Sequence, residues 1–319
     1  MQLELTITIA PAESSGMRLD RALADELKKN APHLSRSVLK ELFQQKKVLL
    51  AGRASAGSTV LAPGPHSIAI LDWESSGVSE APKAVASPDG PFLPVIHEDE
   101  NLLIVNKASG IPSVPHASQE TRTAVSSALA SCPALSGIGH GGLEPGLLHR
   151  LDNGTSGLLV FAKSNAEFQR LRKAWSQAGV KKVYRARIVR PSASEPIVVP
   201  SELRWLMAHD EKSDKRMIAF PEGIPTGARY RGKPMSTITR LIRLHSPTDL
   251  EIEIETGVMH QIRCVLATLG FPVLGDPIYG KTPSERLWLH AWKLSLPQAD
   301  GSRLELEAPL PEGFTNWPL

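Results

Sequence analysis

The segment from Leu148 to Ser164, LHRLDNGTSGLLVFAKS, constrains the fold more than any other part of the chain. It begins with a charged cluster made of His149, Arg150 and Asp152. Asn153-Gly154, the dipeptide most tolerant of positive φ, predicts a turn after this cluster. Leu158 to Ala162 are apolar over the length of a buried strand. The sequence therefore places a carboxylate and an arginine at the edge of a core strand, where charges are rare unless they are paired or used.

Hydrophobic periodicity predicts two domains. Leu3 to Ile9 alternate like a half-buried strand, and two helices follow, the second with Ser35 as its N-cap. Residues 73–91, WESSGVSEAPKAVASPDGP, are rich in Ser, Ala, Pro and Gly and have no periodicity. We predict a small α/β domain over residues 1–72, a linker over residues 73–91 and a larger domain over residues 92–319.

The larger domain shows the alternation of antiparallel strands. Val183 to Val189, Thr237 to Leu244 and Leu250 to Glu255 each carry alternate apolar residues. Ser164 and Glu167 form a capping box that predicts a helix, and a second helix is expected before Leu269. Many such strands with a few covering helices predict an α+β domain with a mainly antiparallel, mixed sheet.

Bulk composition excludes several classes of protein. The 36 Lys and Arg against 33 Asp and Glu give a net charge of only +3, so the distribution of charge must decide whether the chain binds nucleic acid. Cys132 and Cys264 lie far apart and form no C-x-x-C, which predicts no disulfide framework and no zinc knuckle. The N-terminus lacks the features of a secretory signal, and no run approaches the roughly 18 apolar residues of a membrane span. A cytoplasmic protein is expected.

Basic residues concentrate between Met17 and Arg53, where nine Lys or Arg face four Asp or Glu. The candidate RNA contacts in this stretch are Arg36, Lys40, Lys46, Lys47 and Arg53. A solvated helix face is the simpler interpretation of a basic stripe on an isolated helix. Here the stripe continues into the following turn, which favours contact with phosphates.

Asp152 has three interpretations on local sequence alone. A neighbouring arginine would keep the carboxylate ionised and ready as a nucleophile. A structural ion pair at the turn is equally compatible with the local residues. Metal ligation by His149, Asp152 and His260 is opposed by the charge of Arg150. Each histidine taken singly suits a structural role, and Tyr184 suits a core tyrosine or, beside Lys and Arg, a platform on which a base stacks.

Four motifs, in order, resemble those of the RluA-type RNA pseudouridine synthases. HRLDNGTSGLLVFAKS resembles the catalytic motif, IVNKASGIPSVP with Lys107 the first motif, and KVYRARI the motif with the base-stacking tyrosine, Tyr184. ETGVMHQIRCVLATLGFPVLGDPIYG resembles the C-terminal motif, which contains His260, Gln261, Arg263, Gly275, Asp276, Tyr279 and Gly280. The likeness covers roughly residues 95–310. About 55 N-terminal residues resemble the small RNA-binding domain named after the fourth protein of the small ribosomal subunit.

The resemblance implies an enzyme that isomerises uridine in structured RNA to pseudouridine. The target base leaves its stack at a cost of a few kcal/mol, and Arg150 enters the helix in its place. Asp152 acts as the nucleophile or as a base on the ribose, Tyr184 stacks on the base, and Arg263 pairs with Asp152. Further RNA contacts are implied for His149, Lys107 and His260. The expected partner is RNA, with large-subunit ribosomal RNA favoured over transfer RNA; no metal or organic cofactor is expected, and the protein is expected to be a monomer.

Two departures from the family pattern stand in the C-terminal motif. Val258 and Met259 replace the usual Arg and Thr, and Val265 replaces the usual His. The loss of a cation at Val258 is expected to weaken or alter a phosphate contact. The alternative function is a non-catalytic RNA-binding or RNA-folding protein on the same scaffold. A carboxylate-based hydrolase would need two cooperating acids, and the motif offers one.

Overall fold

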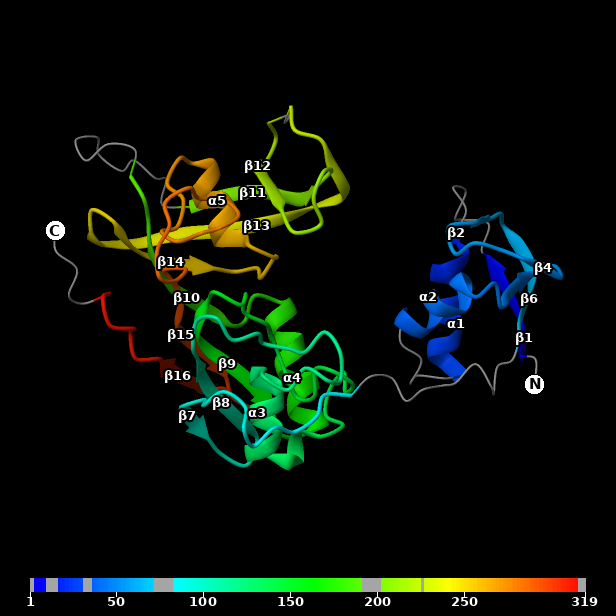
Figure 1. Cartoon of the computed structure of the whole chain (residues 1–319), viewed down its shortest axis with the longest axis horizontal. Coiled ribbons are helices and arrows are strands. Elements are labelled where there is room, and N and C mark those ends of the chain that lie inside the picture. Colours follow the sequence, from blue (N-terminus) through cyan, green and yellow to red (C-terminus); the bar gives the residue numbers. More distant parts are fainter. Residues whose placement is uncertain are drawn as a thin grey trace. The chain divides into compact units, whose positions relative to one another are not determined.

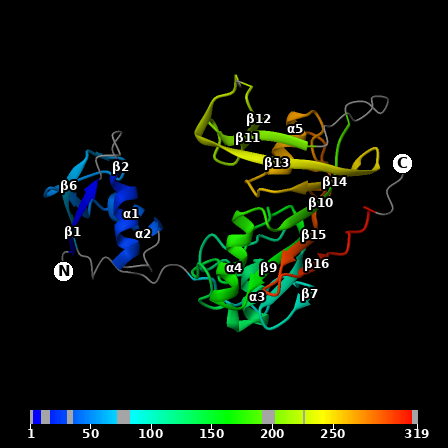
Figure 2. The same cartoon turned by 180° about the vertical axis from the view of Figure 1, so that it is seen from behind.

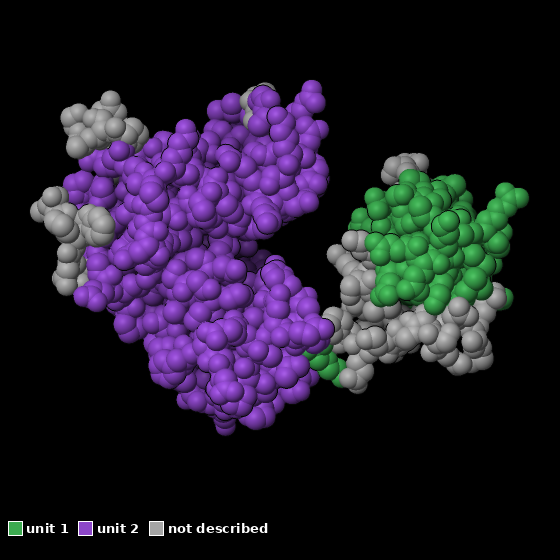
Figure 3. All heavy atoms as spheres, viewed as in Figure 1, with its two compact units in different colours: residues 1–83 green, residues 84–319 purple. Residues whose placement is uncertain are grey.

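The computed structural model of the chain describes residues 3–9, 17–30, 36–71, 83–190, 202–224 and 227–314, without the side chains of residues 28–30, 36–38 and 40. It divides into two compact units, residues 1–83 and 84–319 (Figure 3). The second unit begins earlier than the predicted residue 92. The backbone N–H groups of Ala84 and Ser87 donate to the carbonyls of Gly142 and Ser126, so the end of the predicted linker is part of this unit. Residues 72–82 of the linker region and the predicted cap Ser35 lie outside the described residues.

The first unit is a small α/β structure, as predicted. A four-stranded sheet has the order β1 (Leu3–Ile9), β6 (Gly64–Ile70), β3 (Val48–Leu50), β4 (Arg53–Ala54), and β2 (Met17–Arg18) pairs with β5 (Val60–Leu61). The helices are α1 (Leu19–Asn30) and α2 (Arg36–Gln44). Apolar residues of both helices pack with inward residues of the strands, among them Leu19, Leu23, Leu42, Val48, Ile68 and Ile70.

The second unit is built on one ten-stranded sheet in the order β12, β11, β13, β14, β10, β15, β9, β8, β7, with β16 paired to β15. The strands are β7 (Val95–Glu98), β8 (Leu102–Lys107), β9 (Ser156–Ala162), β10 (Lys181–Arg187), β11 (Glu202–Asp210), β12 (Met217–Pro221), β13 (Tyr230–Ser246), β14 (Asp249–Ile254), β15 (Leu289–Pro297) and β16 (Arg303–Glu307). Among these described strands only β9 and β15 pair in parallel. The predicted mixed, mainly antiparallel α+β domain is confirmed.

The helices divide between two halves of this sheet. Helices α3 (Ala124–Ser131) and α4 (Asn165–Ser176) lie beside β7, β8 and β9, whereas α5 (Gln261–Thr268) lies beside β11 to β14 (Figures 1 and 2). A short 3-10 helix, Pro133–Leu135, follows α3. Strands β10 and β15 join the two halves of the sheet. The surface of the second unit is hollowed between these two halves (Figure 3). None of the described helices is long and apolar enough to cross a membrane.

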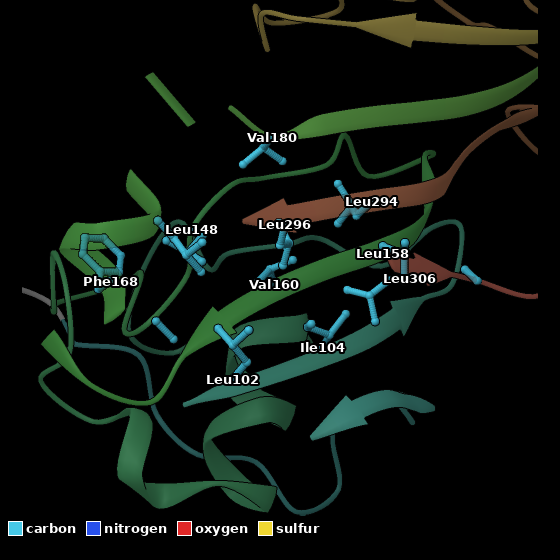
Figure 4. Close-up of a cluster of buried hydrophobic side chains, with 13 residues drawn as sticks. Leu102, Ile104, Leu148, Leu158, Val160, Phe168, Val180, Leu294, Leu296 and Leu306 are labelled. Atoms are coloured by element: carbon cyan, nitrogen blue, oxygen red, sulfur yellow. The ribbon is translucent and has the colours of Figure 1, made fainter. Parts of the chain in front are cut away.

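The core beneath the first half explains why β9 is so strongly apolar. Residues of β8, β9, β15 and β16 pack with Phe168 of α4 (Figure 4). All seven residues of β9 are buried, because both faces of this central strand are covered. At the start of α4, Ser164 Oγ accepts the Glu167 N–H at 3.2 Å, as the predicted capping box requires. The Glu167 carboxylate instead binds Arg170, so only half of that box forms.

Candidate active site

The turn that carries Asp152 is held by neighbouring backbone. The Thr155 N–H donates to the Asp152 carbonyl at 3.0 Å. Neither Asn153 nor Gly154 has a positive φ, so the conformational reason expected for this dipeptide is wrong. Glycine is required at position 154 for another reason: a Cβ there would lie 2.9 Å from the Cβ of Leu287. The turn is therefore shaped by its contact with the segment that leads into β15.

Lys107 is buried beside this turn and binds its backbone. Its Nζ donates to the carbonyls of Ile111 at 2.7 Å, Ala108 at 3.1 Å and Asn153 at 3.3 Å. The side chain is completely buried, and burial lowers its pKa to about 7, while the Asp152 charge acts in the opposite direction. The prediction that Lys107 contacts RNA is wrong, because its ammonium group is enclosed and occupied by three carbonyl groups.

Asp152 is joined to a buried arginine and a second carboxylate. Arg263 on α5 donates from Nη1 to Asp152 Oδ2 at 2.7 Å, and from Nε and Nη2 to the two oxygens of Asp276 at 2.7 and 2.8 Å. The side chains of Arg263 and Asp276 are 5% and 0% exposed, whereas that of Asp152 is 27% exposed. The expected pairing of Arg263 with Asp152 is present, and it joins the two halves of the sheet. We call these three residues the carboxylate–guanidinium cluster.

Asp276 supplies the fixed end of this cluster. Burial by itself would raise the pKa of Asp276, but the hydrogen bonds and charge of Arg263 hold it below its ordinary value. The backbone N–H groups of Ile278 and Tyr279 also donate to Asp276 Oδ1, at 2.9 and 3.1 Å. Burial would lower the pKa of Arg263, but Asp276 and Asp152 raise it, so its charge is permanent. The edge of the guanidinium formed by Nε and Nη2 thus binds Asp276, and Nη1 is left to orient Asp152.

Tyr184 lies on β10 between the two halves. It pairs in register with Ile252 of β14 and Ala291 of β15, and it is half-buried against apolar residues from both sides. Burial raises its pKa far above the ordinary value, and the negative charge of Asp152 adds to the shift. The phenol is therefore protonated at neutral pH.

The cations beside Tyr184 on β10 have structural partners. Arg185 and Arg187 are buried, and their guanidinium groups lie over the rings of Trp292 and Trp288. Arg185 and Arg187 are therefore packed against tryptophan rings of the protein.

Arg150 and His149 have different environments. The Arg150 side chain is 64% exposed and lies 3.1 Å from Glu144, so it is not the ion-pair partner of Asp152. The His149 ring stacks on Trp175 of α4 with centroids 4.8 Å apart, and its Nε2 is buried without a hydrogen bond to the described residues. Burial, with a contribution from the charge of Lys182, lowers the His149 pKa to about 3. The His149 ring is therefore neutral and supported by Trp175, and its RNA contact stays a prediction.

His260 is at the N-terminus of α5 and faces the cluster. Its Nε2 lies 3.8 Å from Asp152 Oδ2, and its Nδ1 lies 3.0 Å from the hydroxyl of Tyr279. No role was predicted for Asp276 or Tyr279, although both belong to the motif matched there. Both lie in the short loop from Gly275 to Gly280, which places the Asp276 carboxylate against Arg263 and the Tyr279 hydroxyl against His260.

The residues that depart from the family pattern have apolar surroundings. Val265 is fully buried in a cluster with Trp205 and Met207 of β11, and Val258 packs against the same cluster. Met259 is 38% exposed. Apolar side chains therefore suit positions 258 and 265, where they cover strands β11 and β12.

The basic residues of the first unit are described in part. Lys46 is exposed and adopts a left-handed conformation with φ 57°. The Lys47 N–H donates to the Leu42 carbonyl at 3.0 Å, which ends α2 as a Schellman motif and directs the chain away at Lys46. Arg53 is exposed in β4, and the side chains of Arg36 and Lys40 lie outside the described residues. Across the described part of the chain, no group of three His, Cys, Asp or Glu residues could hold a metal ion.

Comparisons with known proteins agree with this geometry. A family model described as RNA pseudouridylate synthase matches residues 101–268. A Chloroflexus aurantiacus protein named "Uncharacterized RNA pseudouridine synthase" is 32% identical over 98% of this chain and 92% of its own length. "Ribosomal large subunit pseudouridine synthase D" of Zymomonas mobilis is 31% identical over 94% of this chain and 92% of its own length.

The solved structure of human RNA pseudouridylate synthase domain containing 1 has a TM-score of 0.52 and 22% identity. It covers 69% of this chain and 84% of its own, which shows a shared fold. The family model spans more than half of the sequence, and the Chloroflexus relative matches almost all of it. The chain therefore belongs to the RNA pseudouridylate synthase family and is an RluA-type RNA pseudouridine synthase.

Proposed function

We propose that this enzyme isomerises specific uridines of large-subunit ribosomal RNA in the cytoplasm, with Asp152 as the reacting group. The observation that carries this proposal is the asymmetry of the carboxylate–guanidinium cluster. Asp276 and Arg263 are buried and bound to each other, while Asp152 is partly exposed and bound through one oxygen. A carboxylate held in this way is oriented and accessible, as a nucleophile or a base on ribose requires.

The remaining site residues suit base flipping. Arg150 is exposed close to the Asp152 turn, where it can leave Glu144 and occupy the space of the flipped base. Tyr184 remains protonated, which favours a stacking platform and a hydrogen-bonding role over that of a phenolate base. The bond that breaks and the bond that forms belong to one nucleotide, so the reaction needs no cofactor, and one chain supplies all the proposed groups.

The substrate is proposed from the relatives. The Zymomonas protein is named for the large ribosomal subunit and is similar over nearly the whole of this chain. Pseudouridine mapping of total RNA from cells with and without this protein should show a loss confined to large-subunit ribosomal RNA. Restoring wild-type protein should restore the same positions. Loss of pseudouridine from transfer RNA instead would contradict the proposed substrate.

The basic residues of the first unit should contribute phosphate contacts. Changing Lys40, Lys46, Lys47 and Arg53 to alanine should weaken RNA binding and reduce the slope of log K against log salt by about 0.7–0.9 for each phosphate that is no longer neutralised. Filter binding at several salt concentrations measures this slope. Gln45→Ala, a neutral change in the same exposed turn, is the matched control. A slope equal to wild type in the quadruple variant would assign these residues to an ordinary solvated surface.

A further inference from the structure

His260 has a backbone conformation that needs an explanation. Its φ of 56° and ψ of 22° are left-handed, and it is the N-cap residue of α5. For a residue other than glycine this conformation costs about 1 kcal/mol or more and marks positions over-determined by their surroundings. The imidazole makes no capping hydrogen bond to the helix. The Gln261 side chain accepts from Thr256 and from the Val258 N–H, both in the segment before the helix. Something other than helix capping therefore determines where the imidazole points.

The contacts of Tyr279 define the protonation of this imidazole. The Tyr279 oxygen accepts the Met217 N–H at 2.8 Å, which leaves its own proton for the His260 Nδ1 at 3.0 Å. The guanidinium groups of Arg216 and Arg263 lie over the Tyr279 ring, at 5.3 and 5.5 Å from its centroid. A neutral His260 that accepts at Nδ1 carries its proton on Nε2. Nε2 is the nitrogen that faces Asp152.

Burial favours this neutral form of His260. Burial lowers the His260 pKa, the negative charges of Asp152 and Asp276 raise it, and Arg263 lowers it further, with a net shift downward. The His260 side chain is 11% exposed. A neutral imidazole can donate a hydrogen bond to a carboxylate without adding a second permanent cation beside Arg263.

The two oxygens of Asp152 are not equivalent. Arg263 donates to Oδ2, and His260 Nε2 approaches the same atom at 3.8 Å. Within the described parts of the chain, no group donates a hydrogen bond to Oδ1. Catalytic hydrogen bonds are often long in an unliganded enzyme and shorten when the substrate is bound.

We propose that His260 is a positioning residue whose Nε2–H, fixed in that tautomer by Tyr279, closes on Asp152 Oδ2 when RNA binds. Together with Arg263 it holds that oxygen, so Oδ1 is the atom that reacts with the ribose. This inference rests on the proposed role of Asp152, and it replaces the RNA contact predicted for His260. An oriented catalytic hydrogen bond of this kind differs from simple packing of His260 against Tyr279.

The kinetic test separates positioning from RNA binding. His260→Asn retains a residue that tolerates the left-handed conformation, but its short amide does not reach Asp152. His260→Gln extends an amide donor toward the position of Nε2. Single-turnover rates are measured with enzyme in excess over a large-subunit ribosomal RNA transcript, by tritium release from uridine labelled at the base carbon that becomes bonded to the sugar. RNA affinity is measured separately.

His260→Asn should lower the single-turnover rate about 10–100-fold, the loss expected for a hydrogen bond to a charged group, with RNA affinity within about twofold. His260→Gln should recover at least part of that loss. The control is His97→Ala. The Nε2 of His97 lies 2.8 Å from Asp99 Oδ2, and this pair does not belong to the site, so the variant should keep the wild-type rate. Weaker RNA binding with a normal rate at saturation, or equal rates for the Asn and Gln variants, would overturn the proposal.

The tautomer has its own readout. In wild-type protein labelled with nitrogen-15 at histidine, the His260 signals should show a protonated Nε2 and an unprotonated Nδ1. They are assigned by their loss in His260→Asn. Tyr279→Phe removes the hydroxyl and keeps the ring, so it should redistribute the proton between the two nitrogens and slow the reaction several-fold. A proton on Nδ1 in the wild type would refute this inference even where Asp152→Asn is inactive, whereas an active Asp152→Asn variant would refute the underlying function.

Discussion

Asp152→Asn should abolish pseudouridine formation while the protein folds and binds RNA within about twofold of wild type. The amide has the shape of the carboxylate and can still accept from Arg263, so the turn is retained. It can neither attack the sugar nor remove a proton from it, and we expect the single-turnover rate to fall by roughly 10⁴-fold or more. Asp152→Ala should have the same effect on the rate.

The matched control for this change is Asp300→Asn, an exposed aspartate that binds Ser302 in a surface turn. It should isomerise uridine at the wild-type rate. If Asp152→Asn retains more than a few per cent of activity, Asp152 is not the reacting group. If it loses RNA binding together with activity, the carboxylate serves the RNA interface and the catalytic assignment fails.

Asp276→Ala should produce the largest loss of stability of any change in the site. Asp276 is fully buried, accepts two hydrogen bonds from Arg263 and accepts two more from backbone N–H groups. Its removal leaves the arginine with a single, partly exposed partner in Asp152. Breaking a buried pair by removing one member typically costs about 3–5 kcal/mol. Urea unfolding at neutral pH measures this cost, and the rate should also fall, because Arg263 is then free to change its orientation.

The unfolding free energies of wild type and of Asp276→Asn should depend differently on pH. Its folded pKa is lowered, so the ionised form adds stability above the unfolded pKa of about 3.9. This stability is lost as the pH falls through the lower folded pKa. Asp276→Asn has no such titration, and its unfolding free energy should fall less than that of wild type between about pH 5 and pH 2.

A second buried pair provides the control for Asp276. Arg185 and Asp249 form an ion pair on β10 and β14 whose side chains are 6% and 4% exposed, and neither belongs to the carboxylate–guanidinium cluster. Asp249→Asn should destabilise the protein comparably and leave the rate of the folded enzyme unchanged. Equal loss of rate in both variants would show that Asp276 acts only through stability.

Local patterns predicted most of the elements around the site. The buried strand at Leu158 to Ala162 and the helix after Ser164 are set by an apolar run and a cap, and both are present. Strands β11 and β12 were not predicted, although they form one end of the large sheet. Leu203, Trp205 and Met207 alternate along β11 and are buried, so the sequence carried a strand signal there. The pairing of β11 and β12 with each other, and of β11 with β13, is visible only in the structure.

Lys107 and His149 show how packing changes the interpretation of a motif. Both belong to charged or polar clusters beside a predicted active segment, which favoured RNA contact. In the folded protein Lys107 donates to three carbonyl groups and His149 packs on Trp175. Motif membership identifies residues needed near the site, but burial decides whether a side chain faces the substrate or supports the turn.

The sequence by itself determined the class of fold, the family and the segment that contains Asp152, because these depend on periodicity and on ordered local motifs. The residues next to Asp152 left it evenly balanced between a reacting group and a structural ion pair, and the family resemblance, with Tyr184 and Arg263, favoured the reacting group. Only the tertiary structure gave the geometry of the expected pairing, in which Arg263 Nη1 donates to one oxygen of Asp152, and showed that Asp276 binds another edge of the guanidinium. The physical reason is that the orientation and accessibility of a carboxylate depend on groups from distant strands and helices, which meet only when the sheet is assembled.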